Sequence, residues 1–235
     1  MATSPDAPHS QTLSRGIRVL EILGESEGPM TIAALSVALG VHRSIAYRIL
    51  RTLEDHGLVV RDAGGAVQLG PRMAALARSV SRDLQTAALP ALTSVANDLT
   101  MTAFLAVLDR HEVVTLLSVE PTHVHATVAQ RPGTRHPLAS GAPGIAIQSV
   151  LTEAQWLTLG SEHPRAEAAQ ARKRGYATSH DEVIPGLASV AVPLTLAGQP
   201  PVAIAVVYVV GGSHDVAAIG ARLRGAAEAV AREFA

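Results

Sequence analysis

The sequence predicts an α+β protein with an N-terminal winged helix-turn-helix, a connecting helix, and a C-terminal domain built on an antiparallel sheet flanked by helices. Two observations predict this class. The first 70 residues contain short helical patterns followed by a hairpin signal, and from Met101 the apolar residues change from a helical period to the period of two typical of strands. The chain has 235 residues, 48% of them apolar, which suffices for two hydrophobic cores.

The N-terminal part is expected to contain three helices and a hairpin. Apolar residues recur at helical spacing over 13–23, 31–40 and 44–55. Two short strand-like runs follow, over 58–61 and 66–69, separated by a turn that contains two consecutive glycines. Helix, short helix, turn, longer helix and hairpin together are the order of a winged helix-turn-helix.

The remaining organisation follows from composition and proline placement. The polar start of the chain predicts a disordered tail over 1–11, before the helix-turn-helix over 12–70. A helical stretch over 71–86 is expected to connect it to the C-terminal domain over 87–235, with Pro90 marking a break in the helical pattern.

The C-terminal domain mixes strands and helices. We expect a hairpin over 103–120 that turns at Asp109-Arg110-His111, and a further strand over 122–130. Helices are predicted over 144–151, 152–160, 164–175 and 215–234, and strands over 190–198 and 201–210.

Composition excludes several classes of protein. The chain has no cysteine, so disulfides, thiolate metal sites and cysteine nucleophiles are excluded, and a reducing cytoplasm is the expected compartment. No apolar run approaches the roughly 18 residues needed to span a bilayer, so no membrane partner is expected.

The charge is unevenly distributed. The net charge of the whole chain is −1, but between Arg43 and Arg82 seven arginines face three acidic residues, a local net charge of +4. Such a basic segment suits contact with nucleic acid. A GC-rich genome, whose codons favour arginine, would explain the same bias, and the count alone leaves both explanations open.

The order of these motifs resembles the IclR family of bacterial regulators. The resemblance begins at LSRGIRVLEIL and continues through IAALSVALGVHRSIAYRILRTLEDHGLVVRD and VQLGPRMAALA. In the second half PLASGAPGIAIQS, GYATSHDEVIPGLASVAVPL and VAIAVVYVVGG are similar to the effector domain of that family, which has a GAF-like arrangement of strands and helices. The resemblance covers about residues 12–234 and implies a ligand-responsive transcriptional regulator.

The third helix would be the one that reads DNA. The major groove admits one α-helix, whose outer face needs polar and guanidinium side chains. The candidate DNA-binding residues are His42, Arg43, Ser44, Tyr47, Arg48 and Arg51, with Arg61 in the wing at the minor groove. Arg43 and Arg48 are the candidates for guanine edges, Ser44 and Tyr47 for phosphates or bases. Packing of Tyr47 over the helix remains an alternative.

The resemblance also places an effector pocket on one side of the C-terminal sheet. One wall would comprise Leu138, Ser140, Gly141 and Ala142, where a helix N-terminus offers backbone N–H groups to an acid. Asp181 or Glu182, together with Ser189, would lie opposite. Val206 and Tyr208 would form the floor, although the pattern leaves the strand register open by one residue, which would exchange the two faces.

Two departures from the family make this pocket less polar. Many relatives have a lysine where this chain has Ile145, and the floor strand VAIAVVYVV lacks the hydroxyls of relatives that bind small polar acids. We therefore expect an organic acid with an apolar, preferably aromatic, body. No other cofactor is expected.

Three rival functions have weaker support. His123 and His125 could share a strand face and bind a metal, with His111 or His136 elsewhere in the domain, but no third ligand has a compelling spacing. A hydrolase triad could be drawn from Ser140, His136 and Asp181, but the SGAPG context lacks a nucleophile elbow, so no enzyme is expected. A scaffold with a degenerate reader would not need the arginines of the third helix.

Assembly is implied by the resemblance and by symmetry. A two-fold protein reads a palindromic operator in double-stranded DNA, and pairing doubles the phosphate contacts of a reader with few cations. The first helix and the connecting helix are the expected surface of a homodimer, and relatives often form a dimer of dimers. A repressor is the favoured expectation and an activator the alternative.

Overall fold

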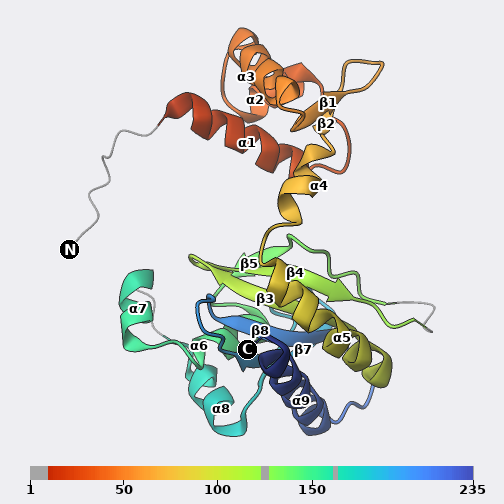
Figure 1. Ribbon diagram of the computed structural model, residues 1–235, viewed down its shortest axis with the longest axis vertical. Coiled ribbons are helices and arrows are strands. Elements are labelled where there is room, and N and C mark those ends of the chain that lie inside the picture. Colours follow the sequence, from red (N-terminus) through yellow and green to blue (C-terminus); the bar gives the residue numbers. More distant parts are fainter. Residues whose placement is uncertain (1–9, 123–126, 161–163, 235) are drawn as a thin grey trace. The chain divides into compact units, whose positions relative to one another are not determined.

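The computed structural model describes residues 10–122, 127–160 and 164–234. The chain divides into two compact units, with the boundary between Val80 and Ser81 (Figure 1). Together they have the α+β class that the sequence predicts: a helix-turn-helix unit followed by a unit of helices around an antiparallel sheet.

The first unit is a winged helix-turn-helix. Its elements are α1 (Gln11–Glu25), α2 (Ile32–Ala38), α3 (Arg43–Asp55), β1 (Val59–Arg61), β2 (Val67–Leu69) and α4 (Arg72–Ala77). Ser10 and Thr31 cap α1 and α2, each accepting a backbone N–H with its side-chain oxygen. Val19, Leu35 and Leu50 are fully buried and form the centre of a small aliphatic core, which the wing joins through Val59 and Val67.

The segment between the units differs from the prediction. Instead of one connecting helix over 71–86, α4 ends at Ala77 and a separate helix, α5, begins at Arg82. Ser81 has left-handed backbone angles (φ 46°), which interrupt the run of helical hydrogen bonds. None of the residues of α4 is buried within this chain, so packing does not extend this helix.

The break in the helix that was predicted at Pro90 is not observed. Helix α5 (Arg82–Leu99) continues through this residue. A proline inside a helix costs on the order of 3 kcal/mol, but Pro90 itself is exposed, and the buried face of the helix runs from Leu84 past it to Ala96. Packing of that uninterrupted face on the sheet offsets the missing hydrogen bond, which sequence periodicity alone does not reveal.

The second unit is built on six antiparallel strands in the order β5-β4-β3-β8-β7-β6. The strands are β3 (Thr102–Asp109), β4 (Glu112–Val119), β5 (Arg135–Pro137), β6 (Ala177–His180), β7 (Leu187–Leu194) and β8 (Val202–Val209). The β3–β4 hairpin turns where the sequence predicts, with Arg110 in a left-handed conformation. Strands β5 and β6 were not predicted, because three or four residues are too few to show alternation.

Helices cover both faces of this sheet (Figure 1). Helices α5 and α9 (Val216–Phe234) pack on one face against side chains such as Leu105, Val190 and Ile204. Helices α6 (Gly141–Gln148) and α8 (Ala166–Arg174) pack on the other against the alternate residues, including Phe104 and Ala205. Helix α7 (Glu153–Leu159) follows α6 and begins with a capping box made by Thr152 and Gln155.

The strand predicted over 122–130 is not observed where the structure describes it. Residues 127–130 belong to no strand, and residues 123–126, which include the two histidines of the proposed metal pair, lie outside the described residues. Among the residues that the structure does describe, no three metal-ligating side chains form a cluster. Within the same residues, no helix has the length and apolarity required to cross a bilayer.

Candidate functional site

Helix α3 presents two contrasting faces. Ala46, Ile49, Leu50 and Leu53 are buried on one side, which fixes the orientation of the helix on its core. The side chains of four predicted DNA-binding residues are exposed away from that core: Arg43, Tyr47, Arg48 and Arg51. Three guanidinium groups on one exposed helix face provide the long, planar donors that suit base edges and phosphates.

The first turn of α3 is held by its own side chains. His42 is the N-cap residue, and its Nδ1 atom lies 3.3 Å from the backbone N–H of Ser44 and 2.9 Å from the Ser44 hydroxyl oxygen. Both predicted contact residues therefore have a structural role in starting the helix, and both side chains are exposed. The cap fixes the point from which Arg43 and Arg48 project.

The wing is tied back to α3, which corrects the expected role of Arg61. Its guanidinium pairs with the carboxylate of Glu54, with Nη2 at 2.9 Å from Oε2, and its Cζ lies 5.2 Å from the centroid of the Tyr47 ring. Both ion-pair side chains are about three-quarters buried. Arg61 is thus a brace between wing and helix, and its guanidinium lies against the ring of Tyr47, which is 45% exposed. A DNA contact by Tyr47 stays a prediction.

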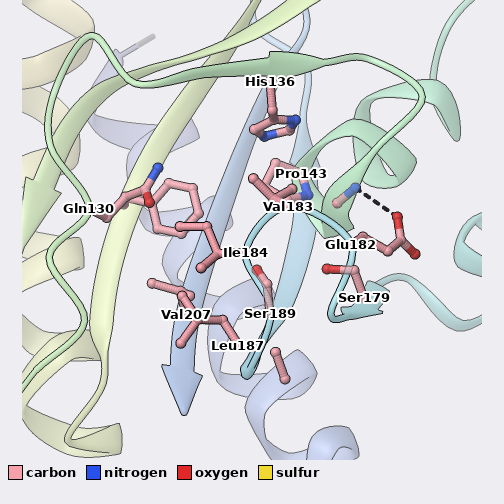
Figure 2. A pocket seen from close by; sticks show the side chains of 13 residues that line it. Gln130, His136, Pro143, Ser179, Glu182, Val183, Ile184, Leu187, Ser189 and Val207 are labelled. Atoms are coloured by element: carbon pink, nitrogen blue, oxygen red, sulfur yellow. Dashed lines mark hydrogen bonds between the residues drawn. The ribbon is translucent and has the colours of Figure 1, made fainter. Parts of the chain in front are cut away.

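The second unit contains a cavity of about 440 Å³, including its open mouth, on the α6 side of the sheet (Figure 2). Its walls are mostly apolar. The lining residues are Phe104, Gln130, His136, Gly141, Pro143, Ser179, Glu182, Val183, Ile184, Leu187, Ala188, Ser189 and Val207. A concave, mostly apolar surface with a few convergent polar groups has the character of a small-molecule site.

The N-terminus of α6 forms part of this cavity, but the protein's own oxygens occupy its first N–H groups. Gly141 donates its N–H to Oε2 of Glu182 at 2.9 Å, drawn as a dashed line in Figure 2, and Ala142 donates to Oγ of Ser179 at 2.9 Å. The carboxylate of Glu182 is also held by the Arg165 guanidinium, Nη1 lying 2.5 Å from Oε2. The anion-binding positions expected for an acidic ligand are therefore filled.

Arg165 is shared between two acids. Besides Glu182 it contacts Glu167, with Nη2 at 2.7 Å from Oε1. The two carboxylates raise the pKa of Arg165, Glu167 contributing most, and the hydrogen bond from Arg165 lowers the pKa of Glu167. This arginine does not line the cavity, and its charge is fully compensated by its two partners.

Only some of the predicted effector residues meet at the cavity. Gly141 and Ser189 line it. Ser140 is the N-cap of α6, and Ala142 reaches the site through its N–H bond to Ser179. Leu138 is buried beneath the helix, where its carbonyl accepts a 2.7 Å hydrogen bond from Gln148, so its assignment to the cavity wall is wrong.

Three further predictions are corrected by one-residue shifts. Glu182, the alternative at that position, faces the cavity, whereas Asp181 contacts His180 and accepts the N–H of Gly186. On β8 the lining residue is Val207, whereas Val206 is buried on the α5–α9 face and Tyr208 packs against that same core and His214. Side chains alternate along a strand, so a register error of one residue exchanges the two faces.

The residues of the suggested hydrolase triad have other partners in the structure. Asp181 pairs with its neighbour His180, and the His136 ring contacts the carbonyl oxygen of Pro137 at 3.1 Å. Ser140 begins α6 and does not line the cavity.

Sequence reasoning missed most of the lining, because these residues come from segments far apart in the chain. Phe104 lies on β3, Gln130 precedes β5, His136 lies within β5, and Val183 and Ile184 belong to the turn before β7. One signal was available. The chain has only two phenylalanines, and Phe104 occupies an alternating strand position, which marks it as a large side chain on a particular sheet face.

His136 is the titratable cavity residue whose pKa is clearly shifted. Its side chain is buried, and desolvation lowers the pKa below the ordinary value of 6.5, against the opposing effect of its hydrogen bonds to Pro137 and Ser140 and of nearby carboxylates. The imidazole is therefore neutral at pH 7. It adds a polar group to the cavity without adding positive charge.

Comparison with known proteins identifies both units. The family model for the IclR helix-turn-helix domain matches residues 12–63, and the model for the C-terminal part of bacterial IclR transcriptional regulators matches residues 77–232. Transcriptional repressor IclR of Escherichia coli is 30% identical over 208 residues, which is 80% of this chain and 75% of that protein.

Solved structures have the same fold. An IclR transcriptional regulator from Alicyclobacillus acidocaldarius is 25% identical and superposes with a TM-score of 0.82, covering 97% of this chain and 100% of that one. An IclR homologue from Microbacterium hydrocarbonoxydans, complexed with 4-hydroxybenzoate, is 23% identical with a TM-score of 0.80, covering 95% and 99% of the two chains. Relatives in this family are transcriptional regulators and not enzymes. The chain belongs to the IclR family and is a DNA-binding transcriptional regulator.

Proposed function

We propose that this protein is a repressor of a catabolic operon and that it binds a palindromic operator as a homodimer. We further propose that a small organic effector, bound in the cavity of the second unit described above, relieves or modulates repression. The observation that carries the proposal is the exposed arginine face of α3, which the buried face of the same helix holds in a fixed orientation. Curated relatives that are repressors, including the acetate operon repressor of Salmonella typhimurium at 31% identity, favour repression over activation.

Within the reader we assign base contacts to Arg43 and Arg48 and phosphate contacts to Arg51. His42 and Ser44 hold the first turn and lie close enough to the exposed arginines to approach the DNA backbone. The wing tip over 62–65 contains an acidic residue and no basic one, so its electrostatic contribution to DNA binding is small. The helix supplies most of the affinity.

Dimerisation is proposed through α1 and α4. Leu13 and Ile17, one turn apart on α1, are 64% and 49% exposed, and Leu76 on α4 is 53% exposed. Large apolar side chains exposed together on helices typically mark a protein interface. A second copy that covers them would double the arginines presented to DNA, as the low overall basic content requires. Pairing of C-terminal units into a dimer of dimers rests on family resemblance.

The effector is proposed to have an apolar, ring-like body. Phe104, Val183, Ile184, Leu187 and Val207 provide walls for such a body. The sequence predicts an organic acid, because a helix N-terminus can bind an anion. Those N–H groups are engaged by Glu182 and Ser179, so an acid would have to displace side chains of the protein.

The test is fluorescence anisotropy of the full chain on DNA from upstream of its own gene and on random DNA, across a salt series. We expect a sequence-preferring, salt-sensitive transition. Arg43→Ala and Arg48→Ala should each weaken specific binding by about 1–3 kcal/mol. Arg232→Ala is the matched control, because it removes one exposed arginine from the end of α9. Equal binding to both DNAs, with no effect of the α3 variants, would contradict the proposal.

A further inference from the structure

The effector cavity is negatively charged. Among its lining residues, all of which the structure describes, the carboxylate of Glu182 is the one formal charge, and burial keeps His136 neutral. The arginine that holds Glu182 is shared with Glu167, so the three groups together carry one net negative charge. A ligand carboxylate placed here would meet like charge in a partly desolvated site, which is unfavourable.

The backbone donors of α6 that could compensate such a charge are already used. The N–H groups of Gly141 and Ala142 bind oxygens of Glu182 and Ser179, each at 2.9 Å. An acid could reach them only by breaking both hydrogen bonds and leaving Glu182 next to the incoming carboxylate.

The hydrogen-bonding groups that remain mostly accept. The Gln130 side chain donates one N–H of Nε2 to Oγ1 of Thr115 at 2.8 Å, which leaves Oε1 as acceptor and one further N–H as donor. Ser189 donates its hydroxyl to the carbonyl of Val206 at 2.8 Å, which leaves the Ser189 oxygen as acceptor. Glu182 accepts through both oxygens. Figure 2 shows these side chains on different sides of the same apolar space.

We propose that the cavity selects an uncharged aromatic compound with hydroxyl groups, such as a phenol or a benzylic alcohol, over a carboxylate of the same shape. Its ring lies against Phe104 and Val207, and its hydroxyl donates to Glu182, Gln130 or Ser189. This inference deepens the proposed effector function and rests on it. It differs from the organic acid expected from the sequence, because the acid's place is taken by a carboxylate of the chain itself.

The experiment compares two probes with one ring and different charge. Isothermal titration of the full chain at pH 7.5 with 4-hydroxybenzyl alcohol and with 4-hydroxybenzoate should give at least about tenfold tighter binding of the alcohol. Any binding of the acid should require proton uptake, so its affinity should fall by up to about tenfold per pH unit, while that of the alcohol stays level over the same range.

Two variants locate the selectivity. Glu182→Gln removes the charge but keeps an oxygen for the Gly141 N–H, and should narrow the ratio between the probes by strengthening acid binding. Asp98→Asn is the control: it removes a carboxylate that pairs with Arg222 on α9 and lies outside the cavity, so the ratio should remain close to that of the wild type. Circular dichroism and operator binding verify that each variant is folded.

The outcomes separate the inference from the proposed function. Tighter binding of the acid, without proton uptake, would overturn the inference. So would the binding of neither probe by protein that still binds its operator, and in that case the DNA-binding function stands. Tight binding of the alcohol with no change in operator affinity would support the ligand class and contradict the effector role.

Discussion

The guanidinium of Arg61 on wing strand β1 pairs with the carboxylate of Glu54 on helix α3 and lies over the ring of Tyr47. This contact joins the wing to the helix that reads DNA in the proposed function. Because both charged side chains are about three-quarters buried, the pair is screened less by solvent than a surface ion pair.

Removal of this brace should lower both stability and DNA affinity. We expect Arg61→Ala to reduce the free energy of unfolding by about 1–3 kcal/mol, since it leaves the buried Glu54 carboxylate without its partner. Urea denaturation measures the loss. Arg18→Ala, which breaks the exposed pair with Glu21, should cost less than about 0.5 kcal/mol. Equal effects of the two substitutions would show that the wing is not held by this contact.

Burial of His136 predicts a pH-dependent stability. Its pKa in the folded protein lies below the ordinary value of 6.5, so the unfolded chain binds the proton more readily. The contribution of neutral His136 to the free energy of unfolding should therefore be fully present above about pH 6.5. As the pH falls below that value, the free energy of unfolding should decrease by up to about 1.4 kcal/mol per pH unit. Denaturation at pH 7.5 and 5.5 tests this. His136→Asn should have a shallower dependence, and an unchanged slope would contradict the assignment.

Two glycines should respond oppositely to alanine. A Cβ added at Gly144 in α6 would lie 2.3 Å from the carbonyl oxygen of Leu138, a backbone atom that cannot easily move. We expect Gly144→Ala to destabilise the C-terminal unit by about 1–3 kcal/mol and to weaken effector binding. Gly225 in α9 has open space around its Cβ position, so Gly225→Ala should stabilise by about 0.5–1 kcal/mol. Thermal denaturation compares them, and destabilisation by both would show that α9 is packed more tightly than described.

The apolar surface of α1 should control the oligomeric state. Ile17→Asp places a charge on the proposed dimer surface and should shift the protein to monomer in analytical ultracentrifugation, with weaker operator binding. Leu157→Asp is the control, because Leu157 on α7 is 77% exposed and belongs to the other unit. A dimer that persists in Ile17→Asp would place the interface elsewhere.

Local patterns in the sequence determined much of this protein. The helix starts at Thr31 and near Ser44, the glycine hairpin of the wing, and the turn at Arg110 depend on residues close together in the chain, so caps, turn residues and periodicity were enough to predict them. The exposure of the arginines of α3 could be predicted in the same way, since the helical period assigns each residue to a face of the helix.

Only the tertiary structure decided what depends on packing between distant segments. Helix α5 passes through Pro90 because a buried face continues beyond it, and the β8 residue in the cavity is Val207 and not Val206 because pairing with β3 and β7 sets the register. The partners of Arg61 and of the α6 N-terminus could also not be predicted from the sequence alone. A guanidinium or a backbone N–H can bind any nearby carboxylate, and only the folded chain brings Glu54 to one and Glu182 to the other.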